Sequence, residues 1–185
     1  KELKKYKYKF KTTSDIEVLA NSWKHWGYNM FEKLNGMFAI SIYDKKKNII
    51  MLARDIAGEK PLYYSKIGKK FYFASEAKVI ENRFINVFQH CISDTLWKDV
   101  YQLKPGHHLT INLKTLKFKI EEYWKFKNVK IDLKHPEEQL EELLIKSIKL
   151  RLRSDVNFGL YYSKGMDSKF LSFLFNFKNK FYFND

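Results

Sequence analysis

The sequence contains little cysteine and no long hydrophobic run. Cys91 is the single cysteine of the 185 residues, which excludes an internal disulfide and a cysteine-based metal cluster. The apolar runs are short, such as residues 38–42, whereas a membrane-spanning helix needs about 18 to 20 apolar residues. The first residues also lack the apolar centre of a signal peptide. We therefore expect a globular protein of the cytoplasm without a membrane span, in which the Cys91 thiol has a structural role.

Arginine is scarce as well, although the chain is strongly basic. A net charge of +14, from 35 basic and 21 acidic residues, would attract a phosphate backbone. Phosphate groups and base edges favour arginine, yet 31 of the basic residues are scattered lysines and only four are arginines, at positions 54, 83, 151 and 153. The charge therefore indicates a compositional bias, and we expect no nucleic-acid partner.

The pattern of residues 1–124 predicts a mostly antiparallel sheet with a helix or two. Ser14 and Glu17 fit a capping box. Gly27 is placed to end the helix of about twelve residues that follows. Alternating apolar residues separated by polar turns then predict three hairpins, at residues 36–55, 61–76 and 107–124.

A weakly patterned stretch at residues 125–135 is typical of a linker, and a helix is predicted after it. Pro136 suits the first turn of this helix. Acidic residues follow Pro136 and basic residues come near the end of the helix, which suits the helix dipole. Apolar residues at steps of four predict a face that packs against another element: Leu140, Leu144, Ile148 and Leu152.

The last part of the chain predicts the beginning of a parallel α/β sheet. A strand, a helix and a second strand are expected at residues 157–162, 169–177 and 180–184. Two strands cannot close such a sheet, so we expect a second domain that is cut short at Asp185.

The turn between that strand and helix has the composition of a phosphate-binding loop. Ser163 would lie at the carboxyl end of the strand, and Gly165 would let backbone amides approach an anion at the start of the helix. The pattern is not the Walker motif. The alternative is a plain turn in which Ser163 or Asp167 caps the helix. These residues alone favour neither interpretation.

Other polar residues have a structural and a functional interpretation. Asp15 either stabilises the start of the first helix or faces a cleft and holds a substrate ammonium group. Arg54 and Asp55, at a strand end, are typical of a structural ion pair, and the alternative for them is a catalytic role. His107 and His108 follow a Pro-Gly turn into a strand, and His90 only neighbours Cys91 in sequence. No spacing of ligands indicates zinc.

Taken in order, seven segments resemble motifs of the glutamine-dependent asparagine synthetases. They are TSDIEVLANSWKHWG, LNGMFAISIYD, LARDIAGEKPLYY, FYFASEAKVI, LKPGHHL, RLRSDVNFG and YSKGMDS, and together they cover nearly the whole chain. The resemblance implies an α+β, Ntn-hydrolase-like part of a class II glutamine amidotransferase domain at residues 1–124. It further implies a linker at 125–135 and the start of an α/β parallel-sheet ATP pyrophosphatase domain, of adenine nucleotide α-hydrolase type, at 136–185.

The family resemblance also implies the chemistry. The first domain releases ammonia from glutamine, and the second uses ATP and Mg²⁺ to adenylate the side chain of aspartate. Ammonia then reaches the adenylate through an internal channel, where it stays unprotonated and away from water. The implied partners are glutamine, aspartate and ATP, and the complete protein is compatible with a homodimer. The alternatives are a relative that amidates or cyclises another carboxylate and a non-catalytic basic protein or remnant. Five residues differ from the usual synthetase surroundings and leave room for the first alternative: Phe158, Tyr161, Tyr162, Lys164 and Lys169.

Individual residues match family positions. Asp15 matches the aspartate that binds the α-amino group of glutamine. The implied ATP-binding residues are Leu160 and Tyr161 beside the adenine and Ser163, Lys164, Gly165, Asp167 and Ser168 in the pyrophosphate loop. Lys164 stands where the family has glycine. Its side chain would crowd the phosphates or strain the backbone if that position needs a positive φ, or its ammonium would add a phosphate contact. We hypothesise that Lys164 weakens ATP binding without abolishing it.

Other family residues have no match here. The family nucleophile is an N-terminal cysteine, supported by an arginine and an Asn-Gly pair that bind glutamine and form the oxyanion hole. Lys1 is not a nucleophile, and Cys91 does not match that cysteine. The chain also stops before most of the aspartate-binding residues. As given, it is expected not to make asparagine.

Overall fold

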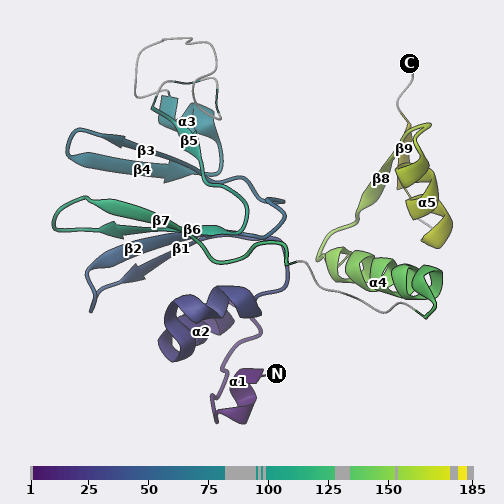
Figure 1. The fold of residues 1–185 in the computed structure, drawn as a ribbon, viewed down its shortest axis with the longest axis horizontal. Coiled ribbons are helices and arrows are strands. Elements are labelled where there is room, and N and C mark those ends of the chain that lie inside the picture. The colour runs from purple at the N-terminus through teal and green to yellow at the C-terminus, as the bar shows by residue number, and fades with distance from the viewer. Residues whose placement is uncertain are drawn as a thin grey trace. The chain divides into compact units, whose positions relative to one another are not determined.

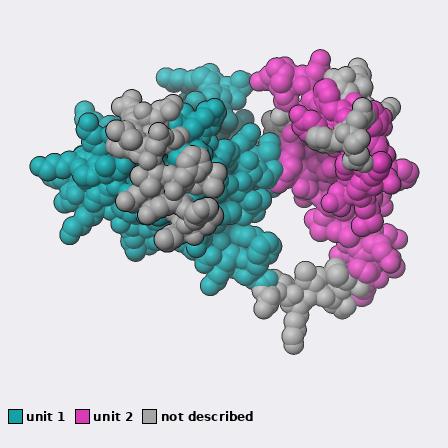
Figure 2. All heavy atoms as spheres, turned by 90° about the horizontal axis from the view of Figure 1, so that it is seen from above, with its two compact units in different colours: residues 1–127 teal, residues 128–185 magenta. Residues whose placement is uncertain are grey.

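The computed structural model describes residues 2–81, 95, 97, 99–127, 134–152, 154–175 and 179–182. The chain forms two compact units, residues 1–127 and 128–185, which Figure 2 colours separately. Each unit is described by itself. The expectations for His90 and Cys91 lie outside the described residues.

Unit 1 consists of two antiparallel sheets and a few helices (Figure 1). Its elements are α1 (Glu2–Lys5), α2 (Asp15–Trp26), the 3-10 helix η1 (Gly27–Lys33), β1 (Ala39–Asp44), β2 (Ile49–Arg54), β3 (Tyr63–Ile67), β4 (Lys70–Ala74), α3 (Ala77–Glu81), β5 (Tyr101–Gln102), β6 (His107–Asn112) and β7 (Phe118–Glu122). One sheet has the order β1-β2-β6-β7 and the other has the order β4-β3-β5. The pairs β1/β2, β3/β4 and β6/β7 confirm the three predicted hairpins.

The buried residues of unit 1 fall into three clusters that define its layers. One cluster joins the two sheets, through residues such as Leu52 and Leu109 of the first sheet and Tyr64 of the second. Another, which contains Phe31 and Met51, joins the first sheet to α2 and η1. A third packs α3 against the second sheet. The order of layers is therefore helix, sheet, sheet, helix.

Strand β2 lies at the centre of this arrangement. Met51 and Ala53 belong to the cluster under α2 and η1, whereas Leu52 belongs to the cluster between the sheets. All three side chains are fully buried. Because successive residues of a strand point to opposite faces, a strand covered on both sides needs a continuous apolar run, which is what residues 49–53 provide.

The start of α2 was predicted correctly, but its capping differs from a capping box. The Ser14 side chain accepts a hydrogen bond from the Ile16 amide (3.2 Å). Glu17 does not bind the Ser14 amide, because that amide donates to Thr12 Oγ1 (3.3 Å). Glu17 instead accepts hydrogen bonds from the amides of Lys11 (2.9 Å) and Thr12 (2.8 Å). These bonds lower the pKa of Glu17, and Gly27 ends the helix as predicted, at a φ of 56°.

We expect the variant Ser14→Ala to lose about 1 kcal/mol of stability, the usual value of an N-cap side chain. The adjacent exposed Thr13 is the matched control, and Thr13→Ala should change the free energy of unfolding by less than about 0.5 kcal/mol. Chemical denaturation of both variants measures the difference. Equal losses would contradict the capping role of Ser14.

Unit 2 contains α4 (Pro136–Arg151), β8 (Gly159–Tyr162), α5 (Met166–Leu174) and β9 (Asn179–Tyr182). Strands β8 and β9 pair in parallel, so the predicted order of helix, strand, helix and strand is confirmed. Helix α4 begins at Pro136, as expected. Its predicted packing face is only partly covered by the described residues. Leu140 is 58% exposed, whereas Leu144, Ile148 and Leu152 are half-buried.

Candidate functional site

The loop between β8 and α5 is closed by two serines. Ser168 is nine-tenths buried, and its hydroxyl donates to the carbonyl oxygen of Ser163 (2.8 Å) and contacts that of Gly165 (3.1 Å). It also accepts a hydrogen bond from the Ser163 amide (3.1 Å). The Ser163 hydroxyl accepts a bond from the Gly165 amide (3.2 Å). Ser168 thus fixes a tight turn at the carboxyl end of β8.

Helix α5 begins three residues earlier than predicted, which places this turn directly against its N-terminus. Gly165 is the N-cap residue, with an extended backbone (φ −66°, ψ 154°), and no side chain caps the helix. The alternative in which Ser163 or Asp167 is the helix cap is therefore wrong. Amides at an uncapped helix start provide donors for an anion.

The backbone at Lys164 is not strained. Within the described residues, the non-glycine positions with positive φ are 7, 48, 99 and 116, so Lys164 is not among them. The condition under which we expected backbone strain at this position is not met. Lys164 is exposed at the surface of the loop.

The two residues expected beside the adenine lie on opposite faces of β8. Leu160 is buried, whereas Tyr161 is 71% exposed and its ring centroid lies 5.8 Å from that of Phe181. Of these two residues, Tyr161 is the one whose side chain a ligand can reach. The exposed Asp167 lies in the first turn of α5. The structure thus brings Ser163, Gly165 and Ser168 into contact and leaves Leu160 in the interior.

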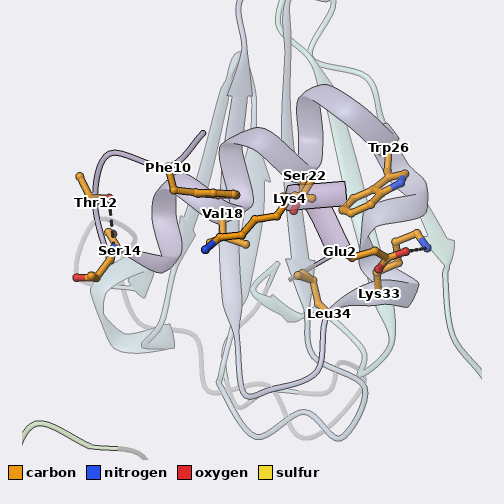
Figure 3. Close-up of a pocket in the computed structure, with 12 residues that line it drawn as sticks. Glu2, Lys4, Phe10, Thr12, Ser14, Val18, Ser22, Trp26, Lys33 and Leu34 are labelled. Carbon is orange, nitrogen blue, oxygen red and sulfur yellow. Dashed lines mark hydrogen bonds and ion pairs between the residues drawn. The ribbon is translucent and has the colours of Figure 1, made fainter. Parts of the chain in front are cut away.

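Asp15 lies in unit 1 and is the first residue of α2. Its side chain is exposed and makes no hydrogen bond or ion pair within the described part of the chain. The preceding residue, Ser14, lines a pocket of about 320 Å³ between the N-terminal segment and α2. Figure 3 shows Thr12 and Ser14 at one end of the pocket and the ion pair of Glu2 with Lys33 at the other. The interior of the pocket is mainly apolar.

Sequence reasoning missed the role of Asp55. This fully buried carboxylate accepts hydrogen bonds from the backbone amides of Phe38 (3.2 Å), Ala57 (3.1 Å), Glu59 (2.9 Å) and Lys60 (3.0 Å). Burial favours the neutral acid, but the four amide bonds outweigh it, and the pKa of Asp55 lies below its ordinary value.

Arg54 is not the ion-pair partner of Asp55, contrary to our expectation. Both residues are described, and no ion pair joins them. The guanidinium instead donates to three carbonyl oxygens, those of Gly58 (2.7 Å), Lys60 (2.8 Å) and Leu103 (2.8 Å). Arg54 and Asp55 therefore act as two separate organisers of the 55–60 loop.

A second loop and the chain after β7 join the same network. The Gly106 amide donates to the Asp55 carbonyl oxygen (3.0 Å), and the Gly106 carbonyl accepts from the amides of Tyr123 (2.9 Å) and Trp124 (3.2 Å). The Tyr123 hydroxyl donates to the carbonyl oxygen of Arg54 (2.6 Å). We call these five residues, Arg54, Asp55, Gly106, Tyr123 and Trp124, the Asp55 junction. Only the Arg-Asp pair and the Pro-Gly turn pointed to it in the sequence.

Two kinds of feature are absent from the described residues. No group of three or more His, Cys, Asp or Glu side chains there is arranged to hold a metal ion. Of the helices described, none is both long enough and apolar enough to cross a membrane.

A protein-family model and two curated relatives match this chain in sequence. The family model of the glutamine amidotransferase domain matches residues 1–124. The glutamine-hydrolyzing asparagine synthetase 2 of Bacillus subtilis is 33% identical over 202 residues, which covers 91% of this chain and 26% of that protein. A putative glutamine-hydrolyzing asparagine synthetase 2 of Methanocaldococcus jannaschii is 31% identical and covers 90% of this chain and 36% of that protein. The chain thus spans about a quarter to a third of these relatives.

Solved structures share the fold. A glutamine phosphoribosylpyrophosphate amidotransferase from B. subtilis, complexed with ADP and GMP, aligns with a TM-score of 0.51 at 18% identity, covering 98% of this chain and 41% of that one. The allosteric regulatory enzyme of purine biosynthesis aligns with a TM-score of 0.53 at 24% identity, over 69% of this chain and 26% of that one. The predicted glutaminase-type fold is therefore confirmed. Because the family model covers more than half of the chain, the chain belongs to the glutamine amidotransferase domain family found in glutamine-hydrolysing asparagine synthetases.

Proposed function

We propose that this chain is part of an asparagine synthase that amidates aspartate, through an aspartyl-adenylate, with ammonia taken from glutamine. The observation that carries the proposal is the turn closed by Ser163 and Ser168, which follows a parallel strand and begins a helix with no side-chain cap. Residues 1–124 would then be the glutaminase part, 125–135 the linker and 136–185 the start of the synthetase domain. We further propose the cytoplasm as its location.

In this proposal Asp15 binds the α-amino group of glutamine. Its carboxylate is exposed and unpaired among the described residues, as a group must be if it is to pair with a substrate ammonium. Ser14 and Thr12, next to it in the chain, line the nearby pocket. The fixed start of α2 would hold the carboxylate in one position, because the Ser14 cap and the Glu17 bonds order residues 11–17.

The loop after β8 suits the phosphates of ATP. A Cβ atom at Gly165 would lie 3.2 Å from the Ser163 hydroxyl oxygen, so a larger residue would crowd the turn where the phosphates approach. When bound, ATP and Mg²⁺ would supply the leaving group that makes the aspartate carboxylate reactive. Mg²⁺ usually binds through substrate phosphates and one or two carboxylates, and the exposed Asp167, in the first turn of α5, would supply a carboxylate. Tyr161 would contact the adenine ring.

The test is to express these residues within their full reading frame and to supply aspartate, ATP, Mg²⁺ and glutamine. Asparagine, glutamate, AMP and pyrophosphate should form together. The variant Asp15→Asn should lose the glutamine-dependent reaction and keep the reaction with added ammonia. Release of pyrophosphate that does not depend on aspartate would contradict the proposed acceptor.

A second acceptor class has specific support. Amidase chyE of Penicillium rubens is 29% identical over 178 residues, covering 87% of this chain. Another carboxylate would then replace aspartate, with the glutaminase part unchanged. Pyrophosphate release measured with a panel of carboxylic acids separates this candidate from asparagine synthesis.

Lys164 should strengthen ATP binding, because its backbone is unstrained and its ammonium is exposed beside the proposed phosphate site. We expect Lys164→Gly to weaken ATP binding roughly threefold to tenfold, the loss of one partly screened charge contact. Lys169→Ala, which removes an exposed lysine of α5, is the control and should leave the affinity unchanged. Titration calorimetry with Mg-ATP measures both. Unchanged binding by Lys164→Gly would refute the added phosphate contact, and tighter binding would support the hypothesis that the side chain weakens binding.

A further inference from the structure

His108 is a buried histidine that the proposed chemistry does not use. It lies on β6, is 6% exposed, and faces the layer formed by α2 and η1. Its ring centroid lies 4.9 Å from that of Tyr28 and 5.4 Å from that of Phe31, both on η1, and 6.5 Å from that of Tyr123. Nδ1 has no hydrogen-bond partner among the described residues. The imidazole thus serves here as an aromatic packing group.

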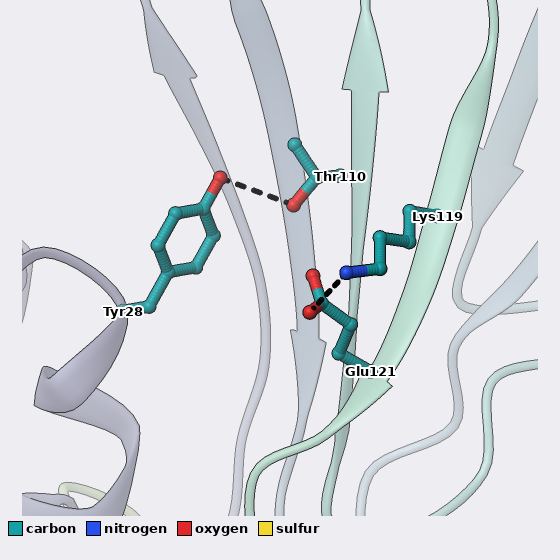
Figure 4. Close-up of polar contacts among 4 residues, drawn as sticks. All are labelled: Tyr28, Thr110, Lys119 and Glu121. Carbon is teal, nitrogen blue, oxygen red and sulfur yellow. Dashed lines mark hydrogen bonds and ion pairs between the residues drawn. The ribbon is translucent and has the colours of Figure 1, made fainter.

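The polar groups near this ring already have partners, and Figure 4 shows two of these contacts, Tyr28 with Thr110 and Glu121 with Lys119. Glu121 is the cross-strand neighbour of His108 on β7, but its carboxylate accepts a bond from the Lys119 ammonium at 2.7 Å. The Tyr28 hydroxyl accepts a bond from Thr110 (3.2 Å). The Tyr123 hydroxyl donates to a backbone oxygen. A protonated His108 ring would therefore have to compete with the Lys119 ammonium for the Glu121 carboxylate.

We propose that His108 is an acid-sensitive switch in unit 1, whose protonation loosens α2 and η1 from the first sheet. An imidazolium ion at this position would be buried against the rings of Phe31 and Tyr28. It would also bring a second positive charge close to that of Lys119. A buried charge without its own partner is costly. Helix α2 also carries Asp15, so its loosening would disturb that residue. This inference concerns the fold and does not rest on the proposed function.

The direction of the effect follows from proton linkage. Burial is the largest influence on the ring and lowers the pKa of His108, while Glu121 raises it and His107 and Lys119 lower it further. The unfolded chain, with a histidine pKa of about 6.5, then binds a proton that the folded chain rejects. The stability that neutral His108 contributes to the fold is therefore present above the pKa of the unfolded histidine. It is lost as the pH falls from that value to the pKa of His108 in the folded chain. One proton changes the unfolding equilibrium constant by up to about tenfold per pH unit.

The experiment compares urea unfolding of the 185-residue chain at pH 7.5 and 5.5 with that of His108→Phe. Phenylalanine fills the aromatic site and cannot be protonated. The wild type should lose up to about tenfold in the folding equilibrium constant between pH 7.5 and 5.5, and His108→Phe should lose much less. His25→Gln, at an exposed histidine of α2, is the matched control and should retain the wild-type loss. Equal pH dependence of the wild type and His108→Phe would overturn the proposal.

Two measurements on the wild type decide the matter if His108→Phe does not fold. The NMR titration of the His108 ring should have its midpoint below those of the exposed histidines. Amide exchange, corrected for intrinsic rates, should lose protection in residues 15–33 at pH 5.5 before it does in β2. A midpoint at or above the exposed histidines, or protection lost from both regions together, would refute the switch.

Discussion

Asp55→Ala should lower the free energy of unfolding of unit 1 by about 3 to 5 kcal/mol, because each buried donor that loses its acceptor costs about 1 to 3 kcal/mol. Four backbone amides depend on this one carboxylate. They come from two separate segments, Phe38 before β1 and the loop 57–60. Removing the carboxylate should therefore unfold both segments together. Urea denaturation followed by tryptophan fluorescence measures the loss.

Glu32→Gln is the matched control, because Glu32 is an exposed acid of the same unit and its change should cost less than about 0.5 kcal/mol. The variant Asp55→Asn adds a test of charge. The Asp55 pKa is lowered by folding, so its contribution is present above the unfolded value of about 3.9 and is lost as the pH falls toward the folded pKa. The difference between wild type and Asp55→Asn should accordingly shrink below about pH 4. A difference that is constant from pH 7 to pH 3 would contradict this role of the charge.

Gly106→Ala should cost about 3 kcal/mol or more, because the new methyl group meets a backbone atom and the backbone conformation itself is unfavourable for alanine. Gly106 has a φ of 68°, and a Cβ there would lie 2.7 Å from the carbonyl oxygen of Trp124. Relief of this contact would require Trp124 to move and would break the hydrogen bonds to the Gly106 carbonyl.

A control variant at Gly68 separates the cost of the steric contact from the cost of the positive φ. Gly68 has a similar φ of 56°, yet a Cβ there meets nothing within 4 Å. Gly68→Ala should cost only about 1 kcal/mol. Thermal unfolding of both variants gives the difference, and equal losses would show that close packing at Gly106 contributes nothing.

The sequence was sufficient where the determining interactions are local. Ser14 and Gly27 correctly predicted the two ends of α2, because capping involves residues a few positions apart. The hairpins and the start of α4 at Pro136 follow from equally short-range signals. The partner of Glu17 was predicted wrongly even though it is local. The Ser14 amide donates to Thr12 instead, and the capping-box pattern does not take Thr12 into account.

Sequence reasoning failed where partners lie far apart in the chain. Arg54 and Asp55 are adjacent, so an ion pair between them was the simplest expectation. Their actual partners include Leu103 and Gly106, which only the folded sheets bring close. The burial of Leu160 likewise depends on what covers β8. The roles of Asp15 and of the loop at 163–168 remain predictions that ligand binding must test.

The Asp55 junction also determines how unit 1 would respond to mechanical load. A pull on the chain beyond Lys127 would first act on Trp124 and Tyr123. Their amides both donate to the Gly106 carbonyl oxygen, and the Tyr123 hydroxyl donates to the Arg54 carbonyl oxygen. The β6/β7 pairing lies behind this anchor in the chain and is shielded by it. We therefore expect unit 1 to resist bending up to Trp124, the last residue that these bonds hold.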